Sequence, residues 1–143
     1  MSTLERSIML ATEAHGGQVD KAGNAYILHP LRVMLSLQSA EDMIVGVLHD
    51  VVEDCPGWTF ERLRGEGFSV DLIAGLESVT KRDGEDYDAF VRRAAAHPIG
   101  RKVKRADIED NCDLTRIANP TKRDFDRIFK YKRALAYLES LGS

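Results

Sequence analysis

The sequence predicts an all-α fold, and three observations support this prediction. Apolar residues recur every three or four positions along most of the chain, as they do on the buried side of a helix. Typical helix-start residues precede several of these stretches, among them Thr59, Ser69 and Thr121. No segment of useful length shows the strict alternation of apolar and polar residues that indicates a half-buried strand. We therefore expect one compact helical domain over residues 1–143.

The first part of the chain predicts three helices separated by breaks that glycine or proline marks. A periodic stretch over residues 4–15 stops at two consecutive glycines, and residues 18–28 follow as a loop. A second helix is expected to start at Pro30, because proline is favoured in the first turn of a helix. The third is expected to run without a break over residues 41–54, up to a Cys-Pro-Gly sequence.

Five further helices are expected in the rest of the chain. The first of them is short, beginning at Thr59 and ending at Gly65 or Gly67. The others are expected over residues 70–79, 86–96, 99–115 and 121–141. No repeat, low-complexity segment or long linker divides the chain, so the helices should pack into a single domain.

Composition and charge are those of a water-soluble globular protein, with 43% hydrophobic and 30% charged residues. The 20 basic and 23 acidic residues leave a net charge of −3, which argues against non-specific binding to nucleic acid or anionic membranes. No apolar run approaches the roughly 18 residues of a membrane span, and the first residues lack a signal-peptide pattern. Cys55 and Cys112 are isolated, as expected of buried, reduced thiols. We expect a cytoplasmic monomer or homodimer with a small-molecule partner.

The segment around His49-Asp50 and Glu53-Asp54 is the most informative part of the chain, because polar side chains here interrupt an apolar run. Burying such carboxylates costs on the order of several kcal/mol unless positive charge lies against them. A divalent cation would supply that charge and would also create a hydrolytic site.

Two further candidate metal ligands lie elsewhere, namely His29 before Pro30 and Asp107 in a partly apolar stretch. Each residue alone is more often a turn, capping or surface residue, and only their joint occurrence indicates a site. Two imidazoles and two carboxylates suit Mn²⁺, Fe²⁺ or Zn²⁺ better than Ca²⁺, which prefers oxygen ligands throughout. We therefore expect one divalent metal ion.

The order His29, His49-Asp50, Asp107 resembles that of the HD-domain metal-dependent phosphohydrolases. The flanking sequences are similar to the (p)ppGpp hydrolase branch of that group, which comprises the hydrolase half of RelA/SpoT proteins and the small alarmone hydrolases. This resemblance covers nearly the whole chain and rests on four segments: Ala14-His15-x-Gly17-Gln18-x-x-Lys21-x-Gly23-x-x-Tyr26-Ile27-x-His29-Pro30, Leu48-His49-Asp50-Val51-Val52-Glu53-Asp54, Val79-Thr80-Lys81, and Val103-Lys104-x-Ala106-Asp107-x-x-x-Asn111.

The resemblance implies an HD-domain helical bundle that removes pyrophosphate from the ribose 3′ position of ppGpp or pppGpp, the alarmones of the stringent response. It implies Mn²⁺ as the ion that the four ligands hold. Glu53 would act as general base towards water, and Asp54 would hold the water or support the leaving group's proton. Substrate contacts are expected from six residues: Lys21, Lys81, Lys104, Asn111, Arg127 and Tyr131.

The chain departs from this pattern at two places. Asp20 replaces the arginine that stacks on guanine in the family, so we expect the stacking platform to be lost. Glu109 and Asp110 add acidic charge beside Asp107, which we expect to disfavour a highly phosphorylated ligand. Two alternatives therefore stay open: a phosphohydrolase of another nucleotide, such as a dNMP or NADPH phosphatase, or a non-catalytic sensor that binds a nucleotide or metal.

Overall fold

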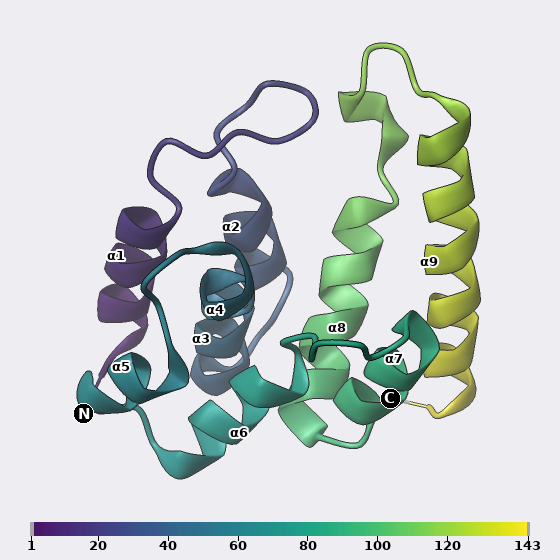
Figure 1. Ribbon diagram of the computed structural model, residues 1–143. Helices are drawn as coiled ribbons and strands as arrows, with labels where there is room; N and C mark the ends of the chain where they lie inside the picture. The colour runs from purple at the N-terminus through teal and green to yellow at the C-terminus, as the bar shows by residue number, and fades with distance from the viewer. Residues whose placement is uncertain (1, 143) are drawn as a thin grey trace.

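The computed structural model describes residues 2–142, and this part of the chain is built from helices (Figure 1). The only strand-like pairing among the described residues is an isolated bridge between Val19 and Ala25. The predicted all-α fold is therefore confirmed. In chain order the elements are α1 Leu4–Ala14, α2 Leu28–Leu35, α3 Ala40–Leu48, α4 Val51–Asp54, α5 Phe60–Gly65, α6 Val70–Ser78, α7 Tyr87–Ala95, α8 Pro98–Asn111, the 3₁₀ helix Leu114–Arg116, and α9 Lys122–Ser140.

Side-chain caps determine where most of these helices begin. The hydroxyl of Thr59 accepts a hydrogen bond from the backbone N–H of Arg62 at the start of α5, and Ser69 does the same at the start of α6. At α9 the cap is reciprocal, because Thr121 and Asp124 each accept from the other's backbone N–H. These local bonds explain why the helix starts could be predicted from the sequence.

The prediction of one continuous helix over residues 41–54 is wrong. The helix breaks at His49 and Asp50, so that α3 ends at Leu48 and α4 begins at Val51. Asp50 has φ −101° and ψ 0°, which lies outside the regular helical range. The stacking of His49 over Glu53 that a continuous helix would impose is therefore not the relevant geometry.

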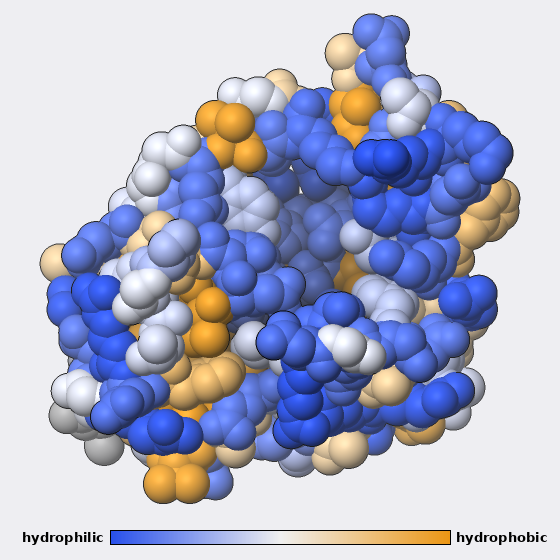
Figure 2. Space-filling view, viewed as in Figure 1, coloured by the Kyte–Doolittle hydropathy of each residue, from blue (hydrophilic) through white to orange (hydrophobic). Residues whose placement is uncertain are grey.

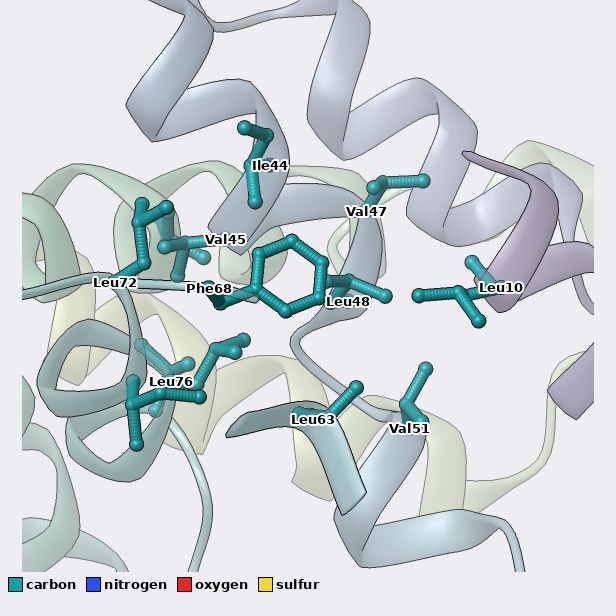
Figure 3. Packing of buried hydrophobic residues seen from close by; sticks show 14 of the residues in the cluster. Leu10, Ile44, Val45, Val47, Leu48, Val51, Leu63, Phe68, Leu72 and Leu76 are labelled. Atoms are coloured by element: carbon teal, nitrogen blue, oxygen red, sulfur yellow. The ribbon is translucent and has the colours of Figure 1, made fainter. Parts of the chain in front are cut away.

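Most of the buried apolar side chains form one large core around α3, which contacts α1, α2, α6 and α8. Figure 3 shows the ring of Phe68, from the connection between α5 and α6, among Val45 and Leu48 of α3 and Leu72 of α6. Trp58 is also buried in this core.

A second and much smaller core joins α7, α8 and α9. Its buried members are Val91, Ala95, Ile108, Ala134 and Leu138. Figure 1 shows α1–α6 on one side of the molecule and α8 and α9 on the other, and Figure 2 shows a hydrophilic hollow between them. None of the helices described here combines the length and the apolarity needed to cross a membrane.

Candidate active site

The four predicted metal ligands lie together, and two of them, Asp50 and Asp107, line a cavity. Each offers one ligand atom, and these four atoms all lie within 4.8 Å of one another. They come from three segments: His29 from the first turn of α2, His49 and Asp50 from the break between α3 and α4, and Asp107 from α8. The break is what allows the adjacent side chains of His49 and Asp50 to converge, with 3.0 Å between Nε2 and Oδ2.

Both imidazole rings present Nε2 to the carboxylates. His29 Nε2 lies 2.9 Å from Asp107 Oδ1, and His49 Nε2 lies 3.3 Å from the same oxygen. The other ring nitrogens are held from behind, because His49 Nδ1 donates to the backbone carbonyl of Gly46 at 2.6 Å and His29 Nδ1 bonds Asp110 Oδ2 at 2.6 Å. Such bonds fix the ring orientation and the tautomer that leaves Nε2 available to a metal ion. The donor set therefore fits a divalent cation.

The four predicted ligands, called the quartet, have electrostatics that favour either protons or a cation at their centre. Burial lowers the pKa of His49, but the charges of Asp50 and Asp107 outweigh it and raise that pKa well above its ordinary value. Burial would raise the pKa of Asp107, yet Lys104 and His49 hold it well below its usual range. Because a metal ion needs deprotonated imidazoles, it would displace these protons, and its affinity should fall as the pH falls.

Glu53 and Asp54 lie beside the quartet. Together with Asp50 they form a cluster of three carboxylates, in which the ligand atoms also lie within 4.8 Å of one another. Glu53 Oε1 accepts a hydrogen bond from the backbone N–H of Lys81 at 2.9 Å, which orients this exposed side chain. Burial, followed by the charges of Asp50 and Glu53, raises the pKa of Asp54 to about 6. Asp54 can therefore hold a proton close to neutral pH.

Several side chains hold the carboxylate ligands in place. The Tyr26 hydroxyl donates to Asp50 Oδ2 at 2.5 Å. Lys104 Nζ lies 3.1 Å from Asp107 Oδ2, and the Asn111 amide donates to Asp107 Oδ1 at 3.1 Å. Tyr26 received no role in the sequence analysis, although it stands within a segment that carries the family resemblance.

Asp110 corrects an expectation, because it supports the site and is not a free anion beside it. Besides bonding His29, its carboxylate accepts from Arg32 Nε at 2.7 Å, and Arg116 Nη2 lies 3.5 Å from it. Burial alone would raise the pKa of Asp110, but the hydrogen bonds from His29 and Arg32 outweigh it and lower that pKa to about 2. Glu109 is paired with Arg105 at 2.9 Å. Neither acid adds unpaired negative charge beside the ligands.

The predicted substrate contacts line two adjoining cavities. Lys81, Lys104, Asn111 and Tyr131 line a cavity of about 220 Å³ that also contains Asp50, Glu53 and Asp107. A second cavity, of about 320 Å³, shares Tyr26, Asn111 and Tyr131 with the first and is further lined by Lys21 and Arg127. The structure thus places all six predicted contacts on the walls of two cavities that share three lining residues.

Asp20 also lines the second cavity, but its carboxylate is used locally. Its Oδ1 accepts hydrogen bonds from the backbone N–H groups of Ala22 and Asn24, each at 2.9 Å, and so shapes the turn before α2. A side chain held in this way offers no cationic surface on which a base could stack.

His15 is buried, with Nδ1 2.8 Å from Gln18 Oε1 and 3.3 Å from Cys55 Sγ, and it is not one of the clustered ligands. Cys55 is a buried free thiol as expected, whereas Cys112 is only partly buried, because it follows the end of α8 at the edge of the small core.

Comparisons with known proteins agree with this geometry. No family model matches the chain. A guanosine-3′,5′-bis(diphosphate) 3′-pyrophosphohydrolase from Aquifex aeolicus is 31% identical over 132 residues, covering 84% of this chain and 19% of the relative. A protein of the same name from Spiroplasma citri is 38% identical over 85 residues, covering 57% of this chain and 11% of the relative. The chain is a homologue of the (p)ppGpp 3′-pyrophosphohydrolases. It spans less than a fifth of the length of these two relatives.

A solved structure shows the same fold. The metazoan SpoT orthologue described as hydrolysing ppGpp and acting in starvation responses superposes with a TM-score of 0.78 at 21% sequence identity. The match covers 96% of this chain and 85% of that chain. The sequence relatives therefore confirm the resemblance that the segments indicated, and the solved structure confirms the fold.

Proposed function

We propose that this chain is a metal-dependent nucleotide phosphohydrolase that releases pyrophosphate from the ribose 3′ position of ppGpp or pppGpp, leaving GDP or GTP. The observation that carries the proposal is the quartet of His29, His49, Asp50 and Asp107 with Glu53 and Asp54 beside it. The names of the homologues supply the substrate class. Binding of the ion by this quartet, and Mn²⁺ as its identity, are parts of the proposal.

In this reaction water attacks the phosphorus bonded to O3′, and the bond between that phosphorus and O3′ breaks. The quartet would hold a divalent ion, which would supply Lewis acidity to the reaction. Glu53, oriented by the Lys81 backbone, accepts the proton of the attacking water. Asp54, whose pKa is raised to about 6, delivers a proton to O3′ as it leaves.

The Glu53→Gln variant tests the catalytic assignment. Glutamine keeps an oxygen that can accept from the Lys81 N–H but cannot take a proton, so the turnover rate should fall by roughly 10²–10⁴-fold. Bound metal, measured by elemental analysis, should stay at the wild-type level because Glu53 is not one of the four ligands. Glu61→Gln, an exposed change on α5, is the matched control and should leave the rate unchanged. Wild-type turnover in Glu53→Gln would contradict the role of this residue.

A phosphohydrolase of another nucleotide is the second candidate, and the local use of Asp20 favours it. A panel of ppGpp, pppGpp, dNMPs and NADPH, each assayed with Mn²⁺, separates the two by the product released. Pyrophosphate from ppGpp supports the leading proposal, whereas orthophosphate from a dNMP or NADPH supports the second. Bound metal without turnover of any of these nucleotides would support the third alternative, a non-catalytic sensor that binds a nucleotide or metal.

A further inference from the structure

Tyr87, the first residue of α7, lines the cavity of about 220 Å³ that contains Asp50 and Asp107, but the sequence predicted no role for it. Its hydroxyl oxygen is buried and, among the described residues, has no hydrogen-bond partner. A buried hydroxyl without a partner costs free energy, which an acceptor atom of a bound ligand would offset. An anionic oxygen of a ligand that reached this hydroxyl would satisfy it.

Two lysines flank the Tyr87 ring. Lys104 Nζ lies 5.5 Å from the ring centroid and Lys130 Nζ lies 4.4 Å from it. Lys104 also bonds the carboxylate of Asp107, so it stands between that predicted metal ligand and Tyr87. Lys130 has no carboxylate within ion-pairing distance in the part of the chain that the structure describes. Asp107 thus contacts Lys104, and the Tyr87 ring lies near both Lys104 and Lys130.

Positive charge is concentrated around Lys130. Burial lowers the pKa of Lys130, and repulsion from Lys104, Arg127 and Lys81 lowers it further. Arg127 is paired with Asp124 and Lys104 with Asp107, but no carboxylate pairs with Lys81 or Lys130 among the described residues. A cluster of like charges with incomplete pairing favours binding of a multiply charged anion.

We propose that Tyr87 and Lys130 bind a phosphate group of the substrate other than the one that reacts at the metal ligands. This inference rests on the proposed function and deepens it, because it names the substrate feature that Tyr87 and Lys130, together called the wall, recognise. A nucleotide with phosphate groups at two positions can occupy the metal ligands and the wall together. A nucleotide with phosphate at a single position reaches only one of them.

The test compares Tyr87→Phe and Lys130→Gln with the wild-type chain. The two substrates are ppGpp and guanosine 3′-diphosphate, which carries phosphate only at its 3′ position. With ppGpp each variant should raise KM about tenfold and leave kcat and bound metal nearly unchanged. With the 3′-only nucleotide the change should stay below about twofold. Tyr137→Phe, a partly buried tyrosine of α9 away from the site, is the control.

The thermal unfolding midpoint separates binding from structure. Tyr87→Phe should unfold at the wild-type temperature or higher, since an unpartnered hydroxyl is removed. An unchanged KM for ppGpp in both variants would overturn the inference, and so would an equal rise with both nucleotides. If the wild-type chain hydrolyses none of the nucleotides, the proposed function fails instead. The wall is then tested by the shift in unfolding temperature that inorganic pyrophosphate causes in wild type and in Tyr87→Phe, and equal shifts would overturn it.

Discussion

The two sides of the cleft are supported very differently. The side with His29, His49 and Asp50 belongs to α2–α4, which pack on the large core, and the neighbours of His49 at Leu48 and Val51 are almost fully buried. The opposite side, with Tyr87, Lys130 and the predicted substrate contacts of α9, rests on the small core. The difference teaches that the ligands proposed on α2–α4 rest on the larger core, whereas the recognition residues proposed on α7 and α9 rest on the smaller one.

α8 connects the two sides, because it contacts α2, α3 and α6 on one side and α7 and α9 on the other. Asp107 lies on this shared helix, bonded to His29 on one side and to Lys104 in its own helix. Damage confined to the α9 side should therefore affect substrate binding before it affects metal binding. The three predictions that follow test this separation.

Leu138→Ala should have the largest effect, on the α9 side. Leu138 is 1% exposed in the small core, and truncating such a residue typically costs about 2–5 kcal/mol of unfolding free energy. Loosening α9 should raise KM for the nucleotide while bound metal stays stoichiometric. Leu48→Ala is the matched change in the large core and should lower metal retention as well. Denaturant unfolding and elemental analysis decide the matter, and equal metal loss in both variants would refute the separation.

Asp110→Asn should have an intermediate effect, on the metal side. Losing the carboxylate behind His29 Nδ1 should weaken Mn²⁺ binding by roughly 10–100-fold, because the imidazole is oriented less firmly and is less basic. Activity at saturating Mn²⁺ should recover most of the wild-type rate. A Mn²⁺ titration measures the change, and Asp113→Asn, an exposed acid in the next turn that also pairs with Arg116, is the control. Identical Mn²⁺ affinity in Asp110→Asn would show that this second bond is not needed.

Glu85→Gln should have the smallest effect, at the connection that joins the two sides. Arg93 of α7 bonds Glu85 and also the backbone carbonyls of Glu77 and Thr80, beside the Lys81 that holds Glu53. The Arg93 hydrogen bond lowers the pKa of Glu85 from 4.5 to about 2, so the pair stabilises the fold above pH 4.5 and is lost as the pH falls towards 2.

Glu85→Gln should therefore cost about 1–2 kcal/mol at pH 6 and close to nothing near pH 2. Denaturant unfolding of both proteins across this range measures the difference. The substitution Glu61→Gln again serves as the exposed control. A difference between wild type and Glu85→Gln that is independent of pH would show that the ion pair is not the cause.

What the sequence determined by itself is the set of local features. Helix periodicity and capping residues such as Thr59 and Thr121 placed most of the helices, because a cap bonds a backbone group only three positions away. The residue types of His29, His49, Asp50 and Asp107, in their order along the chain, indicated a metal site, and the family resemblance they carried was confirmed.

Only the tertiary structure decided how distant residues meet. The break at Asp50 accompanies its contacts with His49 and with the hydroxyl of Tyr26, and no residue pattern in the helix marks it. From the sequence, Asp110 was expected to add negative charge that disfavours a phosphorylated ligand. In the fold its carboxylate bonds the ring of His29, which lies 81 positions earlier in the chain. Likewise, only the packing of the helices shows that the Tyr87 hydroxyl is buried without a hydrogen-bond partner among the described residues. Such contacts depend on how the helices pack against one another, which local sequence preferences do not specify.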